Sequence, residues 1–356
     1  MGDKSITAAA VQMAPVLPFS KEETVDIVCE ATVEAADNGA KLVVFPECFI
    51  PMYPNWSIDL QDETKWMLNL REFTYNAILI PGPETEKIGR VAREKGVYVV
   101  VGANEVEEIY DGALFNSLVF IGPTGDVLGK HRKLFPSNRE KVFHARGDAS
   151  GLRVYDSSVG RLGGLICYEH LQPLLKYALI SQGEQVHCAC WPGWPEFSSG
   201  RTNRHVVDVC SRAHALEGQC FVVAASLFVP ASAAEVADLG NASWTFFGGS
   251  GIINPAGEYV AGPLYDKEGI VYGEIDLRLI PLRKAAVDTT GRDSIPQTIS
   301  LNVDPTQYSP IRWLNGQAPS VSDRVGNGLR YPEERPEACE EESGAPTETH
   351  RRQALH

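Results

Sequence analysis

The chain has 356 residues, of which 44% are hydrophobic and 22% are charged, so it can bury a sizeable core as one large α/β domain or two smaller ones. Its formal net charge of −14 and pI near 5.1 argue against nucleic acid or an anionic membrane as a partner, because both would repel it. No apolar run approaches the ~20 residues that a membrane span needs, and the start shows no signal-peptide core. We therefore expect a cytoplasmic protein.

The first half of the chain alternates strand and helix patterns. Ser20 with Glu23 forms a capping-box pattern at the start of a helix, and Gly96 closes another helix. Pro123 to Asp126 has the composition of a hairpin turn. We predict strands over 6–13, 41–45, 97–102, 117–121 and 127–130, and helices over 20–36, 63–79 and 83–95.

The second half continues the alternation and ends in a meander of strands. We predict helices over 171–180 and 204–217, the first with Pro173 in its first turn. Strands are predicted near 152–156, 161–166, 185–190, 221–225, 251–254, 259–260 and 270–275. The pattern as a whole indicates the α/β fold class.

The C-terminal stretch differs in composition from the rest. From about residue 312 it is rich in Gly, Pro, Ser and Glu, and apolar periodicity is lost. We expect one domain over 1–310, followed by an acidic tail over 311–356 that is disordered or only locally docked.

The eight cysteines are dispersed and include no CxxC pair, which favours neither a zinc ribbon nor a disulfide framework. The one cluster is His187-Cys188-Ala189-Cys190. On a strand its two cysteines share a face while His187 points the other way, and no fourth ligand is visible. We therefore expect no metal.

Three chemically active residues each follow a predicted strand: Glu47, Lys133 and Cys167. A lone cysteine at a strand end is more often a packing residue than a nucleophile, so the other two carry the argument. A carboxylate can take the thiol proton and later activate water. Lys133 and the backbone amide of Tyr168 can stabilise the anion of a tetrahedral intermediate. Between a buried strand and a helix N-terminus, Cys167 would be held rigidly, near partial positive charge.

The motifs around these residues resemble the nitrilase superfamily of carbon–nitrogen hydrolases, whose catalytic glutamate, lysine and cysteine lie in this order. Phe45-Pro46-Glu47 is similar to the glutamate motif, His131-Arg132-Lys133-Leu134 to the lysine motif and Cys167-Tyr168-Glu169-His170 to the nucleophile motif. The resemblance runs from residue 6 to about 305. It implies an αββα four-layer sandwich that pairs into homodimers or larger spiral homo-oligomers.

Within the superfamily the chain is most similar to the true nitrilases. The resemblance implies that Glu140 orients the lysine and that Glu169 helps polarise water or the leaving nitrogen, while Tyr168 stands where many nitrilases have Trp. It implies attack of the Cys167 thiolate on a nitrile carbon to give a thioimidate. Water activated by Glu47 releases ammonia, and a second water releases the carboxylic acid from a thioester. No cofactor is implied.

Other activities on the same scaffold stay open. An amidase or N-carbamoyl hydrolase would use the same three groups on a carbonyl carbon, and a cyanide hydratase or dihydratase has similar flanks of the nucleophile. A non-catalytic assembly module is disfavoured because Glu47, Lys133 and Cys167 are intact.

Four residues in loops at strand ends are candidates for lining the substrate pocket. They are Tyr53, Trp56, Trp191 and Pro192, and core or interface packing is the competing interpretation of the aromatic ones. The loops 51–62, 192–200 and 228–243 are expected to set the nitrile preference.

Overall fold

The computed structural model describes residues 5–58, 62–107, 112–193, 204–230, 232–233 and 246–308. Within these ranges, no helix has the length and apolar character needed to cross a bilayer. The predicted tail at 311–356 and parts of the three predicted specificity loops lie outside the described residues. The domain boundary near residue 310 therefore stays a prediction.

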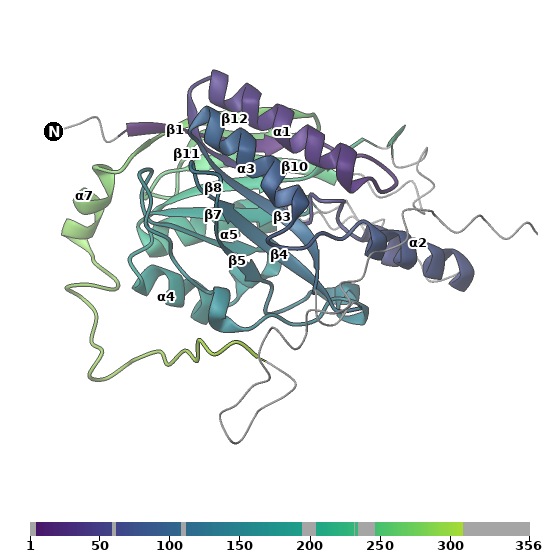
Figure 1. The fold of residues 1–356 in the computed structure, drawn as a ribbon. Coiled ribbons are helices and arrows are strands. Elements are labelled where there is room, and N and C mark those ends of the chain that lie inside the picture. The colour runs from purple at the N-terminus through teal and green to yellow at the C-terminus, as the bar shows by residue number, and fades with distance from the viewer. Residues whose placement is uncertain are drawn as a thin grey trace, which may run out of the picture. The chain divides into compact units, whose positions relative to one another are not determined.

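Two mixed sheets form the centre of the fold (Figure 1). In spatial order the first contains β12 (Gly269–Asp276), β1 (Ser5–Gln12), β2 (Ala40–Val44), β3 (Tyr98–Val106), β4 (Leu114–Ile121) and β5 (Val127–Arg132). The second contains β11 (Tyr259–Tyr265), β10 (Phe246–Ile253), β8 (Phe221–Ser226), β7 (Val186–Trp191) and β6 (Leu162–Ile166), with β9 (Phe228–Val229) paired to β10. β1 to β3 run parallel to one another, as do β6 to β8, and the other neighbours are antiparallel.

The sheets pack face to face because both carry apolar residues on nearly every position of their central strands. β1 contacts β8 and β10, and β4 contacts β6. The approach is close at Gly164, where an added Cβ would lie 2.7 Å from the Leu118 side chain and 2.9 Å from the carbonyl oxygen of Cys188. Glycine in β6 thus lets the strand that precedes Cys167 lie tightly against the first sheet.

Helices cover the outer faces. α1 (Lys21–Asp37) and α3 (Pro83–Lys95) lie side by side over the first sheet, and α4 (Pro173–Ser181) and α5 (Arg204–Gly218) contact each other on the second sheet's side (Figure 1). The remaining helices are α2 (Glu63–Tyr75) and α7 (Leu279–Ala286), and the 3₁₀ turns are η1 (Asn55–Ile58), η2 (Asn138–Val142), η3 (Ala149–Gly151) and η4 (Cys167–Leu171). The predicted αββα four-layer sandwich is therefore confirmed.

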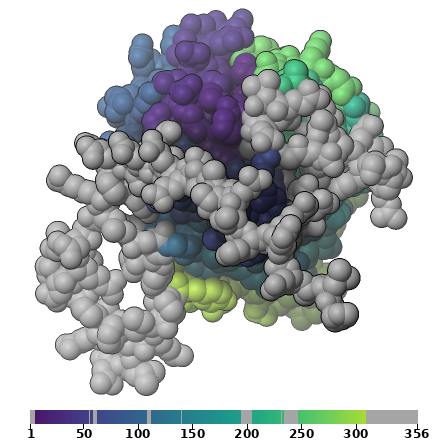
Figure 2. All heavy atoms as spheres, turned by 90° about the vertical axis from the view of Figure 1, so that its right-hand side faces the viewer, coloured from purple at the N-terminus to yellow at the C-terminus, as the bar shows by residue number. Residues whose placement is uncertain are grey.

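The chain beyond α7 runs below α4 in Figure 1. Figure 2 shows the purple α1 region and the yellow-green segment near residue 300 at opposite edges of the face in view. The segment thus borders the helix layer of the second sheet, away from α1.

The local signals read from the sequence place most element ends correctly. Ser20 caps α1 by accepting a hydrogen bond from the backbone N–H of Glu23 at 3.3 Å. Gly96 ends α3 with φ of +63°, a conformation that glycine adopts without a Cβ penalty. Pro173 is the first residue of α4.

Other predicted elements differ from the structure. The predicted strand at 152–156 is wrong, because Tyr155 makes only an isolated bridge to Leu162 there. α2 ends at Tyr75 rather than near 79, since Ile78 instead bridges to Glu105 of β3. β10 begins at Phe246, before the predicted start, and α7 was not predicted.

Candidate active site

Glu47 lies in a tight turn just after β2. The turn presses against β3 at Gly102, where an added Cβ would lie 2.2 Å from the Pro46 carbonyl oxygen and 2.8 Å from the Glu47 Cα. Cys48 has φ of +45°, which turns the chain sharply after the glutamate. The Glu47 side chain is fully buried. A glycine in the neighbouring strand therefore makes room for the backbone that carries this carboxylate.

Lys133 follows β5, and its backbone N–H bonds to the carbonyl oxygen of Asn116 on β4 at 2.8 Å. Its Nζ lies 2.5 Å from Oε1 of Glu47 and 2.9 Å from Oε2 of Glu140. All three side chains are buried. Lys133 is thus paired with Glu140, which was expected to orient it, and also with Glu47, in one salt-bridge cluster.

Asn116 completes this cluster and was not predicted. Its Nδ2 donates to Glu47 Oε1 at 2.7 Å and to Glu140 Oε1 at 2.8 Å. Glu140 is held further by the Ser137 backbone N–H at 2.8 Å and by His144 at 3.3 Å. A polar residue inside the apolar strand Leu114–Ile121 was the sequence signal that could have identified Asn116.

Cys167 is the first residue of η4, directly after β6, with φ of +52° and a fully buried side chain. The predicted helix N-terminus is not beside the thiol, since α4 begins only at Pro173 and a short 3₁₀ turn intervenes. A left-handed conformation costs a non-glycine residue ~1–3 kcal/mol and persists only where the surroundings enforce it. The surroundings of Cys167 must therefore supply that constraint.

Glu169 ties the nucleophile turn to the lysine segment. Its Oε2 accepts from the Ile166 backbone N–H at 3.0 Å and from His131 Nε2 at 2.8 Å, and its Oε1 accepts from the Leu134 backbone N–H at 2.8 Å. Both carboxylate oxygens are thus engaged by residues that flank Cys167 and Lys133. This geometry indicates that Glu169 holds the two segments together. It gives less support to the predicted role of Glu169 in polarising water.

The charges in the cluster shift one another's acidity. Burial raises the pKa of Glu47 to about 7, although Lys133 opposes the shift. Burial would lower the pKa of Lys133. The charges of Glu140 and Glu47 outweigh burial and raise this pKa well above its ordinary value, and a Cys167 thiolate raises it further. Burial would raise the pKa of Glu140, yet Lys133 and His144 hold it well below its usual range. The cluster thus keeps an ammonium beside the thiol and a glutamate that can exchange a proton near neutral pH.

One atom of the cluster has no partner among the described residues. Oε2 of Glu47 is buried and unpaired, while Oε1 accepts from both Lys133 and Asn116. A buried acceptor without a donor is costly unless a bound molecule satisfies it. This atom can therefore take a proton from a thiol or a water molecule.

The predicted pocket residues lie in different surroundings. Burial raises the pKa of Tyr53 well above its ordinary value, and the Glu140, Glu47 and Cys167 charges add to this shift, which places Tyr53 beside the cluster. Trp56 packs in a separate apolar cluster, stacked on Phe143 at 5.7 Å between ring centroids. Trp191 is fully buried, and Pro192 is buried next to it. Trp56 and Trp191 thus pack in buried surroundings, and the pocket-lining role of Tyr53 stays a prediction.

Tyr168 is partly buried, and burial raises its pKa to about 12, with Cys167 adding to the shift. Its side chain is therefore a neutral phenol beside the nucleophile at neutral pH.

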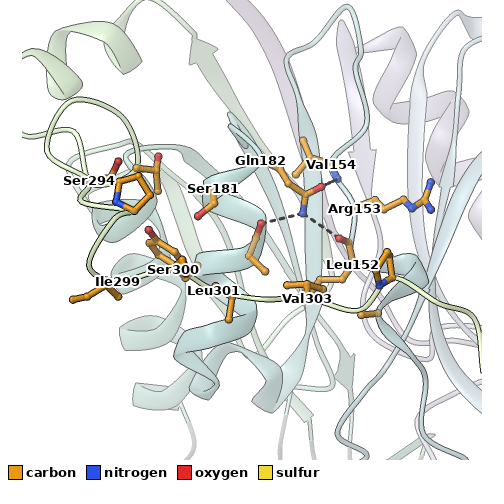
Figure 3. Close-up of a pocket in the computed structure, with 16 residues that line it drawn as sticks. Leu152, Arg153, Val154, Ser181, Gln182, Ser294, Ile299, Ser300, Leu301 and Val303 are labelled. Carbon is orange, nitrogen blue, oxygen red and sulfur yellow. Dashed lines mark hydrogen bonds between the residues drawn. The ribbon is translucent and has the colours of Figure 1, made fainter.

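Two other parts of the described structure offer room or donors for a ligand. Glu184, His187 and His214 are fully buried, and their ligand atoms lie within 4.8 Å of one another, so these residues could hold a metal ion. A surface hollow of about 720 Å³ lies between α4, residues 149–154 and the segment 290–305, where Gln182 donates to the Leu152 carbonyl oxygen at 3.1 Å (Figure 3). Glu47, Lys133 and Cys167 do not line it. The hollow is therefore separate from the candidate chemistry.

The two-sheet sandwich carries the turn with Cys167, the Lys133 ammonium and the carboxylates of Glu47 and Glu140, which are groups that nucleophilic hydrolysis can use. A family profile described as Carbon-nitrogen hydrolase matches residues 7–284. The chain belongs to this family.

Curated relatives cover most of the chain. Nitrilase 3 from an unknown prokaryotic organism is 36% identical over 92% of this chain and 99% of its own length. The nitrilase of Paraburkholderia phymatum is 35% identical over 86% of this chain and 88% of its own length. An aliphatic nitrilase of Rhodococcus rhodochrous is 37% identical over 85% of this chain and 84% of its own length.

Solved structures share the fold. The carbon-nitrogen hydrolase from Helicobacter pylori G27 superposes with a TM-score of 0.67 at 22% identity, over 82% of this chain and 96% of that one. An amidase from Nesterenkonia sp. gives a TM-score of 0.59 at 18% identity, over 81% and 96% of the two chains. At these identities the likeness concerns the fold alone.

Proposed function

We propose that the protein is a nitrilase, which converts an organic nitrile and two water molecules into a carboxylic acid and ammonia. The observation that carries this proposal is the buried Lys133 ammonium between Glu47 and Glu140, with Oε2 of Glu47 unpaired among the described residues. Nitrilases from several organisms are similar to this chain over most of its length, which favours a nitrile over other carbon–nitrogen substrates.

The proposed residue roles follow from the geometry. Glu47 takes the thiol proton, and the Cys167 sulfur bonds to the nitrile carbon. The nitrile nitrogen gains that proton, which gives a thioimidate. Lys133 and the Tyr168 backbone N–H stabilise the negative charge that develops at each addition. Glu140 positions Lys133 and does not act on the substrate, and Ser137, His144 and Asn116 hold its carboxylate in place.

Hydrolysis then proceeds in two rounds. Glu47 takes a proton from water, whose oxygen adds to the thioimidate carbon. That proton and then the hydroxyl proton of the adduct pass to nitrogen, the carbon–nitrogen bond breaks and ammonia leaves. A second water adds to the resulting thioester, the carbon–sulfur bond breaks, and the thiolate and acid are released. Both rounds use the same proton carrier, and a pKa of about 7 suits Glu47 to accept and return protons near neutral pH. The reaction needs no cofactor.

The experiment compares substrate classes on the purified protein. Ammonia release is measured from panels of aliphatic, arylaliphatic and aromatic nitriles, from the matching amides and N-carbamoyl compounds, and from cyanide. We expect acid and ammonia from at least one nitrile class. Release from amides or N-carbamoyl compounds only would favour the other hydrolases of this scaffold, and formamide or formate from cyanide alone would indicate a cyanide hydratase or dihydratase.

Assembly and location are further parts of the proposal. Large apolar side chains are exposed on neighbouring elements of the second sheet's helix layer: Leu171 and Leu174 in η4 and α4, and Val209 and Leu216 in α5. Burying this surface against a second copy would remove it from water, which supports a homodimer or larger spiral homo-oligomer. We propose a cytoplasmic location, with Tyr53 and Pro192 near the substrate.

A further inference from the structure

A second buried polar cluster lies directly behind the nucleophile turn. Nδ1 of His170 lies 2.7 Å from the Cys167 carbonyl oxygen, and Nε2 of His170 lies 2.9 Å from Nε2 of His187. Nδ1 of His187 lies 2.7 Å from Oε1 of Glu184. An unbroken series of hydrogen bonds therefore runs from a carboxylate on the loop before β7 to the main chain of the nucleophile.

The surrounding structure is shaped to hold these groups. An added Cβ at Gly163 in β6 would come within 2.0 Å of Glu184 Oε1, so the glycine leaves the space that the carboxylate fills. The His170 ring stacks on Trp191 at 4.6 Å between centroids. His214 Nε2 donates to Glu184 Oε2 at 2.8 Å, and its ring stacks on His187 at 3.6 Å. All of these side chains are at least 99% buried apart from Glu184, which is 2% exposed.

The carbonyl acceptor at one end of the series determines where His170 carries a hydrogen. The Cys167 carbonyl oxygen can only accept, so Nδ1 of His170 carries a hydrogen. The bond between the two histidines and the bond to Glu184 need one hydrogen each. Either histidine can supply the hydrogen of the bond between the two Nε2 atoms.

The same arrangement fixes the tautomer of His170. If His170 carried its hydrogen on Nε2 alone, Nδ1 would present a lone pair to the Cys167 carbonyl oxygen at 2.7 Å. The carbonyl oxygen therefore requires a hydrogen on Nδ1 of His170, whichever of the two histidines donates in the bond between their Nε2 atoms. Glu184 in turn orients His187. Each group in the series thus orients the next.

The peptide bond links this series to the chemistry. The Cys167 carbonyl and the Tyr168 N–H belong to one planar trans peptide unit, in which they point in opposite directions. A hydrogen bond that fixes the carbonyl oxygen therefore also fixes the N–H, and it polarises that N–H as a donor. The Tyr168 N–H is the proposed donor to the anion that forms at the substrate carbon.

We propose that Glu184, His187 and His170 form a positioning series for the Cys167–Tyr168 peptide, which holds the left-handed nucleophile and aims the Tyr168 N–H at the reaction centre. This proposal rests on the proposed function, since it assigns a donor within that reaction. His170 is a positioning residue, because it acts on the substrate only through the peptide.

The first experiment compares two variants of His170. In His170→Asn, the amide nitrogen stands the same number of bonds from Cα as Nδ1 and can still donate to the Cys167 carbonyl. In His170→Phe, the ring still stacks on Trp191 but donates nothing. Losing an entire oxyanion donor costs roughly 10²- to 10³-fold in kcat. Misaligning the Tyr168 N–H in the Phe variant should therefore lower kcat by about 10- to 100-fold and leave KM nearly unchanged. The Asn variant should recover most of that loss.

A neighbouring variant controls for packing. Ser211→Ala removes the hydrogen bond from Trp191 Nε1, which is 3.2 Å long, and leaves the series intact. We expect its kcat to match the wild type. Wild-type kcat in His170→Phe, or equal losses in the Phe and Asn variants, would overturn the proposal.

A spectroscopic measurement covers the case in which the variants fail to fold. In the wild-type protein labelled with ¹⁵N-histidine, we expect a downfield, slowly exchanging proton on Nδ1 of His170. A His170 ring protonated only at Nε2 would overturn the proposal, as would a stoichiometric metal bound by Glu184, His187 and His214 whose removal abolishes kcat. Wild-type protein that releases no ammonia from any substrate would instead count against the proposed function, and the tautomer would still test the series.

Discussion

Asn116 offers a quantitative test of how the cluster tunes its base. Asn116→Leu keeps a similar volume and removes the donors to Glu47 and Glu140, while the lost Oδ1 has no partner among the described residues. A hydrogen bond to a charged group contributes ~1.5–3 kcal/mol, which corresponds to a rise of roughly 1–2 units in the pKa of Glu47. Only the ionised carboxylate works as a base, so the low-pH limb of kcat/KM should move upward from near pH 7.

The size of the effect follows from the ionised fraction. At pH 7 this fraction falls from about half to about 1–10%, so kcat/KM should drop roughly 5- to 50-fold and recover as pH rises. The measurement is ammonia release between pH 5 and 10. Ser117→Ala is the matched control, since Ser117 donates to the separate carboxylate of Glu105 at 2.5 Å. If the low-pH limb of the Leu variant coincides with that of the wild type, the reasoning about Glu47 fails.

Substitutions at Cys167, Lys133 and Val209 test the remaining parts of the account. Cys167→Ala should abolish ammonia release and leave the circular dichroism spectrum unchanged; undiminished release would exclude the thiol from the mechanism. Lys133→Met leaves two buried carboxylates without their cation and should lower the free energy of unfolding in urea by about 3–5 kcal/mol. Adding Glu140→Gln to Lys133→Met should restore part of this stability but no activity. As a control, Lys41→Met, at an exposed position, should change the free energy of unfolding little. Val209→Asp should reduce the molar mass measured by light scattering, and an already monomeric wild type would contradict the proposed assembly.

The sequence indicated the catalytic candidates because each follows a predicted strand. Lys133 and Cys167 directly follow β5 and β6, and Glu47 lies in the turn after β2. The geometry of the sheets therefore brings their backbones to one region. The order of strands was not predictable from local pattern, because β12 pairs with β1 across more than two hundred residues. The same holds for Asn116, whose two carboxylate partners come from other parts of the chain.

The histidine series shows a different reason for incomplete prediction. His187 was expected to point away from Cys188 and Cys190, but strand alternation says nothing about what it meets. Its partners lie on η4 and on the loop before β7, and the space for Glu184 depends on a missing side chain at Gly163. Such complementarity appears only once the sheet is assembled.

The central claim is that Cys167 bonds covalently to the substrate carbon. Its most direct test is acid quenching of the wild-type enzyme during turnover of a preferred nitrile, followed by peptide mass spectrometry. We predict an acyl adduct on the peptide that contains Cys167 and none on the other cysteines. Ammonia release at full rate with an adduct on a different residue, or with Cys167 unmodified throughout, would contradict the account.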